Sequence, residues 1–246
     1  MTFPSFFKIL TLLLENKLMI KQLKRLLQKL SKKISRKNLD KFIDYYISRI
    51  SNELDGINSL KVLNVGAGGT IETYLKTKFN FVKSIDVDVN REPDQVIDVC
   101  DIDQLKDLTF TPQLICMFEV LEHTKNPINA IQNLHEIIDE NSYVMLSTPF
   151  IFHIHDEPYD FFRFTKYGLE ILFQNFKEVV VKPRNGWFET ILVLFVRLRM
   201  ERNILSKMIG NLFILIYFLL TPITYLLQSI IKSEKITTGY FVYAKK

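Results

Sequence analysis

Cysteine is scarce in this sequence, and its start lacks a secretion signal. The two cysteines, Cys100 and Cys116, both lie in segments that have the pattern of buried strands. This excludes a disulfide framework and a cysteine-rich zinc site, and it fits a reducing cytoplasm. The segment from Met1 to Lys17 has almost no basic charge, a very short apolar run and no cleavage site of small residues. We therefore expect the main domain of the protein to stay inside the cell.

The chain also lacks the composition of a disordered protein. Of its 246 residues, 48% are hydrophobic, 24% are charged and 20 are phenylalanine, so apolar surface is ample to offset the entropy lost on folding. The length suits one α/β domain with appendages and is too short for two full-sized domains. Internal repeats and low-complexity segments are absent.

Acidic residues are rare near both ends of the chain and concentrated between them. Residues 1–37 hold ten Lys and Arg against one Glu, and residues 182–235 hold eight against three acids, whereas residues 38–181 hold twelve against twenty-three. A nucleic-acid-binding protein needs a basic surface on its working domain, so we predict no nucleic-acid partner. The basic N-terminal arm is then either a solvated helix face or a surface for anionic lipid.

The N-terminal arm has the pattern of two helices. From Ile9 to Ile34, leucine and isoleucine recur at helical spacing with lysine and arginine between them, which predicts a basic amphipathic helix. This helix lies either on a membrane surface, on its own domain or on a partner subunit. A second predicted helix begins at the capping candidate Asn38 and leads to the turn signal Asp55-Gly56.

After this arm, short apolar runs alternate with helix-like segments. Five runs predict strands, and IETYLKTK and PINAIQNLHEIIDE predict helices among them. TKYGLEILFQNF predicts a further helix before a sixth strand, KEVVVKP. This alternation predicts a doubly wound parallel sheet of the α/β class. The five runs are KVLNVG, SIDVDV, QVIDVCD, QLICMFEV and SYVMLSTP.

A glycine-rich turn follows the first predicted strand, where a doubly wound sheet binds its ligand. Gly66-Ala67-Gly68-Gly69-Thr70 allows the backbone to approach a bound group closely. A dinucleotide fingerprint that starts at Gly66 needs a third glycine where Ile71 stands, so the NAD or FAD interpretation fails.

Acidic residues follow the next two predicted strands. Asp86 lies 20 residues after Gly66, where a carboxylate can accept both hydroxyls of a ribose, and Asp88 is a nearby substitute. Asp101 is placed to accept from an adenine amino group, with the Ile102 backbone at the ring edge. Each acid alone is also consistent with a solvated loop, but their order at successive strand ends favours a bound nucleoside.

These residues carry a resemblance to a known family. VLNVGAGGT, SIDVD, DVCDI and QLICMFEVLEHTKNP resemble the successive motifs of class I S-adenosylmethionine-dependent methyltransferases, over roughly residues 60–182. GYFVYAKK resembles the last strand of that fold. The resemblance implies a Rossmann-like seven-stranded sheet of order 3-2-1-4-5-7-6, with the seventh strand antiparallel, and S-adenosyl-L-methionine as methyl donor. The positions that it assigns to the donor are Asn64, Gly66, Ala67, Gly68, Asp86, Val87, Asp101, Ile102 and Glu119.

Two positions depart from the family pattern. Asn64 stands where the family usually has an acid, and Gly69 stands one place before the third glycine of a GxGxG pattern, which is Thr70 here. The uncharged Asn64 implies weaker affinity for the cationic donor. A non-catalytic binding or scaffold protein that keeps the fold is therefore the alternative to an enzyme.

The densest polar segment, residues 147–165, follows the fifth predicted strand and lies where an acceptor would bind. Methyl transfer requires alignment of donor and acceptor and removal of the proton of a hydroxyl acceptor. His155 is the best candidate for the general base because imidazole titrates near neutrality, and His153 is the second. By resemblance, Glu119 borders the methionine part of the donor. The segment also resembles the H-x-x-P-x-D-x-x-R-x-T stretch of bacterial methyltransferases from surface-polysaccharide pathways.

Four further residues near this segment have roles that the sequence leaves open. Glu122 and His123 open the next predicted helix, and His123 serves there either the substrate or helix capping and packing. Asp160 and Arg163, expected at the start of a helix, favour a structural pair that holds the loop over contact with substrate. The spacing His-x-His with scattered acids is unspecific for a metal, so we predict none.

A long uncharged run separates the sixth and seventh predicted strands. Met208 to Ile231 contains 24 residues without charge, enough to span a bilayer. A single crossing would leave the seventh strand on the opposite side from its sheet. We therefore expect an even number of crossings, a dip that returns near Thr221-Pro222, or helices in the interface, and a hydrophobic lid is the alternative. Cations flank the run on both sides, as a dip from one leaflet predicts: Arg197, Arg199, Arg202, Lys207, Lys232 and Lys235.

The sequence thus predicts four regions and one function. The regions are a basic amphipathic helical region (1–55), a methyltransferase core (56–186), a hydrophobic helical insert (187–236) and the last core strand (237–246). The predicted function is methyl transfer to a small-molecule, lipid-linked or glycan acceptor. We expect a cytoplasmic protein in peripheral or monotopic association with the inner membrane face.

Overall fold

The chain forms two compact units. The computed structural model describes residues 17–36, 38–54, 56–57, 59–230 and 234–246. The sheet unit comprises Asn38–Arg184 and Glu234–Lys246, and the helical unit comprises Met1–Lys37 and Asn185–Ser233. The helical unit is therefore formed by two segments that are distant in the sequence.

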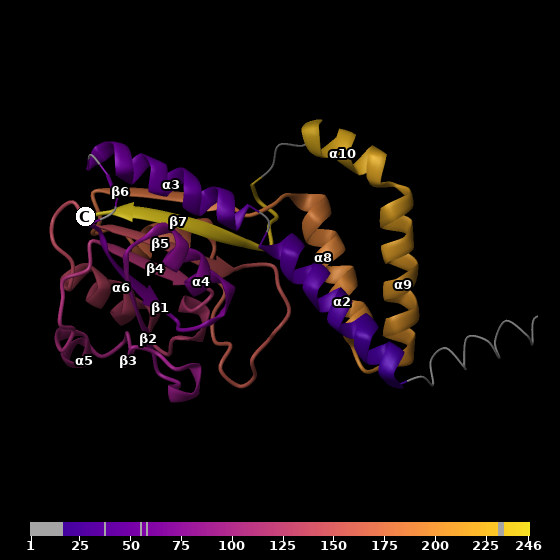
Figure 1. Ribbon diagram of the computed structural model, residues 1–246. Coiled ribbons are helices and arrows are strands. Elements are labelled where there is room, and N and C mark those ends of the chain that lie inside the picture. Colours follow the sequence, from indigo (N-terminus) through magenta and orange to yellow (C-terminus); the bar gives the residue numbers. More distant parts are fainter. Residues whose placement is uncertain (1–16, 37, 55, 58, 231–233) are drawn as a thin grey trace, which may run out of the picture. The chain divides into compact units, whose positions relative to one another are not determined.

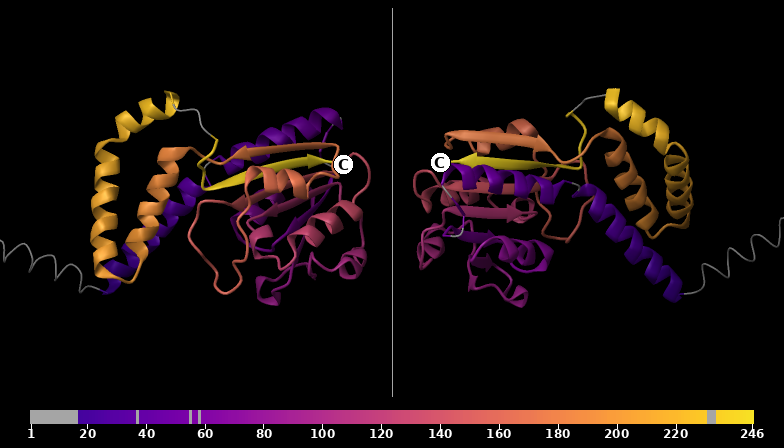
Figure 2. Two further views of the ribbon diagram at one scale, coloured as in Figure 1. Left: turned by 180° about the vertical axis from the view of Figure 1, so that it is seen from behind. Right: turned by 45° about the horizontal axis from the view of Figure 1, so that its top comes forward.

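The sheet unit is built on seven strands in the order β3-β2-β1-β4-β5-β7-β6. All neighbours pair in parallel except β7, which is antiparallel to both β5 and β6. Figures 1 and 2 show β7 between these two strands. The strand order and direction implied by the resemblance are confirmed. The strands are β1 (Lys61–Val65), β2 (Phe81–Asp86), β3 (Gln95–Val96), β4 (Leu114–Phe118), β5 (Tyr143–Pro149), β6 (Glu178–Pro183) and β7 (Gly239–Lys245).

Helices cover both faces of this sheet. On one face, α3 (Leu39–Glu53) and α4 (Gly69–Lys78) pack against the strands. On the other face lie α5 (Ile102–Lys106), α6 (Pro127–Glu136) and α7 (Lys166–Leu172). Two short 3₁₀ helices, η1 (Val89–Arg91) and η2 (Leu121–His123), follow β2 and β4.

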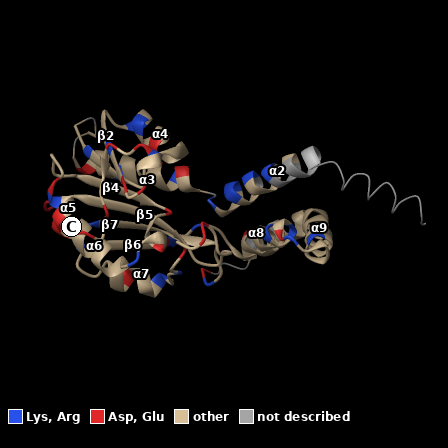
Figure 3. Ribbon diagram, turned by 90° about the horizontal axis from the view of Figure 1, so that it is seen from below, with Lys and Arg blue, Asp and Glu red and all other residues tan. Residues whose placement is uncertain are grey.

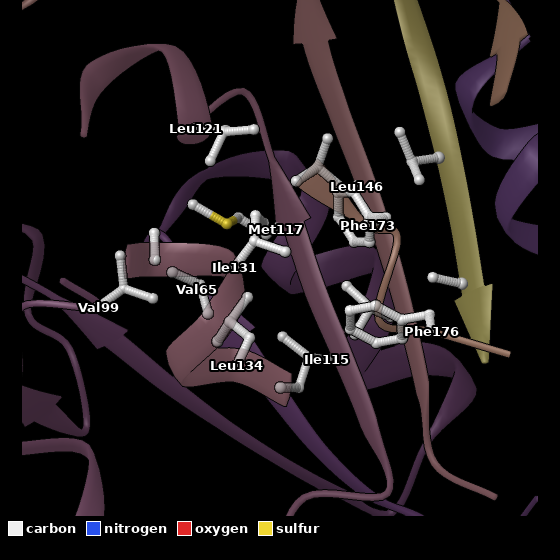
Figure 4. Close-up of a cluster of buried hydrophobic side chains, with 14 of the residues drawn as sticks. Val65, Val99, Ile115, Met117, Leu121, Ile131, Leu134, Leu146, Phe173 and Phe176 are labelled. Carbon is white, nitrogen blue, oxygen red and sulfur yellow. The ribbon is translucent and has the colours of Figure 1, made fainter. Parts of the chain in front are cut away.

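The central strands bury side chains on both faces, which explains their unbroken apolar runs in the sequence. In β4, Ile115 and Met117 join the cluster under α6, whereas Leu114 and Cys116 join the cluster under α3. Figure 4 shows the first cluster, in which Ile131 and Leu134 of α6 meet these strand residues. The alternation follows from the period of two along a strand.

Helix α3 belongs to the sheet unit, although the sequence-based division placed it in the N-terminal region. Its Tyr46 ring stacks on Tyr243 of β7 at a centroid distance of 4.1 Å, and Phe42 stacks on Phe241 at 4.8 Å. Asn38, the predicted cap, makes no capping hydrogen bond with its side chain. It adopts φ 70° instead, and its amide donates to the Arg184 carbonyl at 3.0 Å.

The third strand is shorter than its sequence suggests. QVIDVCD predicts a strand of seven residues, but only Gln95 and Val96 pair with β2. Asp98 turns the backbone away from the ladder, because its side chain accepts the backbone N–H of Cys100 at 2.8 Å. Ile97 and Val99 remain buried in the core beside the strand.

The helical unit contains α2 (Lys17–Ser35), α8 (Trp187–Met200), α9 (Ile204–Leu219) and α10 (Thr221–Ile230). Helix α2 matches the later part of the predicted amphipathic helix, and residues 9–16 lie outside the described residues. A hydrogen bond of 2.8 Å from Arg197 Nε to Ser31 Oγ joins α8 to α2. Phe195 of α8 stacks on Phe213 of α9 at a centroid distance of 4.5 Å.

The uncharged run forms two helices rather than one. Helix α9 ends at Leu219 and α10 begins at Thr221, next to the expected return at Thr221-Pro222; Ile231 lies outside the described residues. Within the described ranges, no helix combines the length and the apolar character that a membrane crossing needs. Figure 3 shows Lys and Arg along α2. Helices α9 and α10 expose apolar side chains. These include Leu205, Met208, Leu212, Leu215, Phe218, Leu219, Ile223, Leu226 and Ile230.

Candidate active site

The glycine turn between β1 and α4 adopts backbone angles that favour glycine. Gly66, Gly68 and Gly69 have φ angles of 94°, 80° and 77°. A Cβ atom on Gly66 would lie 2.5 Å from Val120 Cγ2. The absence of a side chain at Gly66 therefore allows the turn to pack against Val120. Helix α4 begins at Gly69, and the N-terminus of a helix attracts a carboxylate or another anion.

Asp86, the last residue of β2, is tied to this turn. Its Oδ2 accepts the backbone N–H of Ala67 at 2.9 Å, and its Oδ1 accepts that of Asp88 at the same distance. Each carboxylate oxygen can accept a further hydrogen bond. The side chain of Asp88 instead caps η1 by accepting from the Asn90 N–H at 2.9 Å. Of the two acids proposed for the ribose, Asp86 is therefore the one that contacts the glycine turn.

Asn64 and Glu72 hold the turn from within the protein. The buried Asn64 amide donates to the Gly66 carbonyl at 2.8 Å. Glu72 of α4 accepts the Gly68 N–H at 2.6 Å. Sequence reasoning missed Glu72, although its position four residues after Gly68 is the signal of an acid in the first turn of a helix.

The side chain of Asp101 caps the helix that follows it, α5. Its carboxylate caps α5 by accepting from the backbone N–H of Asp103 at 3.0 Å and from the Gln104 side chain at 2.9 Å. Ile102 begins this helix, and Val87 beyond β2 is 65% exposed. The adenine contacts of Asp101 and Ile102 stay predictions.

Glu119 follows β4 and pairs with a buried arginine. It has φ 58° and accepts from Ser147 Oγ at 2.8 Å. The guanidinium of Arg184, which follows β6 and is 2% exposed, binds both carboxylate oxygens, one of them at 3.1 Å. Sequence reasoning missed Arg184 because nothing in its local sequence points to a carboxylate 65 residues away.

The segment between β5 and α7 is held by a fork of hydrogen bonds. Arg163 donates to both oxygens of Asp160, at 2.5 and 2.6 Å, and to the His153 carbonyl at 3.1 Å. Asp160 also accepts the His155 backbone N–H at 2.9 Å. Burial alone raises the pKa of Asp160, but Arg163 and the N–H of His155 outweigh it and lower that pKa to about 2. The two residues thus pair, but they precede α7 in irregular backbone rather than opening a helix.

Two imidazoles and a carboxyl group meet beside this segment. His123 Nε2 lies 3.7 Å from Glu122 Oε1, and His155 Nε2 lies 4.0 Å from the same atom. The rings of His123 and His155 are 5.0 Å apart, and that of His153 is 6.0 Å from His155. Glu122 and His123 belong to η2 and do not open α6, which begins at Pro127. This difference arises because Asn126 caps α6 by accepting the Asn129 N–H.

Burial shifts the pKa values of two groups in this cluster, Glu122 and His155, toward their neutral forms. It raises the pKa of the fully buried Glu122 well above the ordinary value, and the nearby Glu119 carboxylate adds to the rise. It also lowers the pKa of His155, which leaves that imidazole neutral at neutral pH. A neutral imidazole has a nitrogen lone pair that can accept a proton or bind a cation.

The sequence matches a known family over well over half of its length. The family described as "Methyltransferase domain" matches residues 16–187. No curated protein matches the chain.

Solved structures resemble the fold at low sequence identity. A SAM-dependent methyltransferase from Archaeoglobus fulgidus has a TM-score of 0.50 and 12% identity, over 82% of this chain and 94% of its own. The plantazolicin methyltransferase BamL, in complex with a triazolic desmethylPZN analogue and SAH, has a TM-score of 0.50 and 14% identity, over 83% of each chain. At these identities the likeness concerns the fold alone.

Proposed function

The chain belongs to the methyltransferase domain family, and we propose that it methylates a small-molecule, lipid-linked or glycan acceptor at the cytoplasmic face of a membrane. The methyl donor is S-adenosylmethionine. The hydrogen bond between Asp86 and the Ala67 N–H carries the proposal for the donor site, because it fixes a carboxylate beside a glycine turn at the carboxyl edge of the sheet.

The donor site is assigned to the residues that surround this turn. Asp86 receives the ribose hydroxyls, and the turn from Gly66 to Gly68 accommodates the amino-acid part near the start of α4. Asn64 supports the turn through its hydrogen bond to Gly66 and brings no charge. Val87, Asp101 and Ile102 are assigned to the adenosine, and Glu119 to the methionine end of the donor.

The acceptor side is assigned to the polar cluster after β5. In the transfer, a lone pair of the acceptor bonds to the methyl carbon while the carbon–sulfur bond breaks, and sulfur keeps that electron pair as a neutral thioether. A hydroxyl acceptor must also lose its proton. We assign this proton to the imidazoles of His155 and His153, whereas Asp160 and Arg163 position the segment that carries them.

The exposed apolar side chains of α9 and α10 support a membrane-facing acceptor. They form an apolar surface on a unit whose α2 helix is rich in lysine, and such a combination favours an interface with anionic lipid. Lipid-linked acceptors are found at such an interface.

Calorimetry with S-adenosylmethionine tests the donor site. We expect wild-type protein to bind the donor, and Asp86→Ala to weaken binding at least ~10-fold, because two hydrogen bonds to a carboxylate are lost. Asp88→Ala is the matched control, since Asp88 caps η1 and should leave donor affinity unchanged. Equal affinity of wild type and Asp86→Ala would contradict the assignment.

The alternative function is a non-catalytic binding or scaffold protein with the same fold. Asn64, in place of the usual acid, favours this alternative because it removes a negative charge next to a cationic donor. The same titration decides between the two functions. A folded wild-type protein that does not bind the donor would support the scaffold.

A further inference from the structure

We propose that Glu122, His123 and His155 form a binding site for a divalent cation of the first transition series, next to the position of the acceptor. The binding itself is independent of the proposed function. What the cation does for the acceptor rests on that function.

The spacing of the three side chains suits one ion. Each residue offers a ligand atom, and the three atoms lie within 4.8 Å of one another. Glu122 Oε1 is 3.7 Å from His123 Nε2 and 4.0 Å from His155 Nε2, too far for hydrogen bonds. Ligand atoms that bind one ion at about 2.1 Å lie about 3–4 Å from each other. Only small side-chain movements are therefore needed to bind a cation.

Glu122 supplies an independent reason for a ligand at this position. Its side chain is fully buried, and no group in the described part of the chain donates a hydrogen bond to Oε1. The other oxygen, Oε2, accepts only a long hydrogen bond of 3.3 Å from Thr148 Oγ1. A buried carboxyl oxygen without a partner is costly, and a cation would satisfy it.

The Nδ1 atoms of both imidazoles, which point away from Glu122, lie close to oxygen atoms. His123 Nδ1 is within hydrogen-bond distance of the Tyr159 carbonyl oxygen, at 2.8 Å. His155 Nδ1 lies 3.0 Å from Asp160 Oδ2, but it makes no hydrogen bond within the described part of the chain. A proton on His123 Nδ1 leaves the lone pair of that ring on Nε2, and in both rings Nε2 is the atom that faces Glu122. Metal-binding histidines are commonly oriented in this way by a carboxylate or a carbonyl oxygen. Arg163 in turn fixes Asp160 through two hydrogen bonds.

The chemistry of these ligands selects the type of ion. Two imidazoles and one carboxylate suit Zn²⁺, Co²⁺, Fe²⁺ or Ni²⁺ better than Mg²⁺, which prefers oxygen ligands. Three protein ligands leave coordination positions open for an acceptor oxygen or a water molecule.

A cation here would change how the acceptor loses its proton. A bound hydroxyl becomes more acidic because the positive charge stabilises its anion. His155 would then act through the cation, and the proton would pass to water or to His153, which is outside the ligand set. The prediction of no metal rested on the unspecific His-x-His spacing of His153 and His155. The proposed site instead combines His155 with Glu122 and His123 of η2, which the fold brings close to it.

Cobalt binding to the full-length chain tests the site. After chelator treatment and dialysis, we expect wild type to bind one equivalent of Co²⁺, seen as visible absorption bands and as heat in calorimetry. Zn²⁺ should displace it, and Mg²⁺ should not. Glu122→Gln and His123→Ala should each weaken Co²⁺ affinity at least ~10-fold. His135→Ala is the control, because His135 lies in α6 against Phe176 and should leave affinity unchanged.

Three outcomes would overturn the proposal: no Co²⁺ binding by folded wild type, equal affinity of both ligand variants and wild type, or equal loss in His135→Ala. Thermal unfolding of each variant shows whether it folds, and His123→Ala provides a test if the buried Glu122→Gln does not. Calorimetry with S-adenosylmethionine separates this proposal from the proposed function. Cation binding without donor binding would reject only the function, and donor binding without cation binding only the cation site.

Discussion

Gly239, the first residue of β7, leaves the space that the Arg184 guanidinium fills. A Cβ atom at this position would lie 2.7 Å from Arg184 Cζ and also meet the Thr148 carbonyl oxygen. We expect Gly239→Ala to lower the free energy of unfolding by at least about 2 kcal/mol, because it overpacks the site and displaces a buried charge from Glu119. Urea unfolding measures the change.

The control for this substitution is Gly168→Ala. Gly168 lies in α7, where a Cβ atom would make an ordinary contact of 3.4 Å with Thr165 Oγ1. Alanine is favoured over glycine within a helix, so stability should stay the same or rise by up to about 1 kcal/mol. Similar effects of the two substitutions would contradict the steric role of Gly239.

The pair formed by Glu119 and Arg184 can be measured by a double-mutant cycle. Arg184 is 2% exposed, so the loss of either partner leaves a charge in a poorly solvated place. We expect Glu119→Gln and Arg184→Met each to destabilise the protein, and the double variant to recover about 2 kcal/mol relative to the sum. Additive effects in urea unfolding would show that the two charges do not depend on each other.

At the scale of single residues, sequence analysis singled out candidate site residues that belong to local motifs. It missed contacts between residues that are distant in the sequence and meet only in the folded protein. The contact of Asp86 with the glycine turn was predictable because its distance from Gly66 is a known spacing, and its contact with the donor stays a prediction. Arg184 was not predictable, since its buried position depends on the packing of β6, β7 and the end of β4. The grouping of Glu122 with His155 was missed for the same reason, because η2 and the segment after β5 meet only in three dimensions.

At the scale of elements, the end of α3 is tied to two strands by one carboxylate. Glu53 accepts from Lys245 of β7 at 2.6 Å and from the Tyr143 hydroxyl of β5 at 3.0 Å. The Lys245 ammonium contributes most to a lowered pKa of Glu53. Because the folded protein stabilises the ionised form of Glu53, this carboxylate adds to the free energy of unfolding above its unfolded pKa of about 4.3. That added stability is lost as the pH falls below this value.

This linkage predicts a pH-dependent effect of one substitution. Glu53→Gln should lower the free energy of unfolding by about 0.5–1 kcal/mol near neutral pH, and the difference from wild type should shrink as the pH approaches about 4. Glu136→Gln is the control, since Glu136 pairs with Lys106 on the open surface and should have little effect. A difference that persists unchanged in acid would contradict the role of the Glu53 charge.

Elements were predictable where burial dictates the pattern. The strands β1, β4 and β5 followed from unbroken apolar runs, since both of their faces are covered. The placement of α3 did not follow, because its apolar stripe has the same spacing whether it packs on a sheet or on a lipid surface. β3 was overestimated because Ile97 and Val99 are buried in the core although they lie beyond the two residues of the strand.

At the scale of the whole molecule, we assign the proposed membrane binding to the helical unit. We expect wild type to sediment with vesicles that contain anionic lipid, and the double variant Leu215→Glu, Leu219→Glu to remain in the supernatant. Both leucines are exposed on α9, and a charge there opposes insertion of the apolar surface. Ile171→Glu is the matched control, because Ile171 is equally exposed but lies on α7 in the sheet unit. Binding of all three proteins to the same extent would contradict the role of α9.

The position of β7 also has a consequence for biosynthesis. This strand fills the gap between β5 and β6, yet it follows α8, α9 and α10 in the chain. During translation, the segments that form α8, α9 and α10 are synthesised before β7. Until β7 is synthesised, β5 and β6 lack their shared neighbour, so the sheet can be completed only after the whole helical insert has been made.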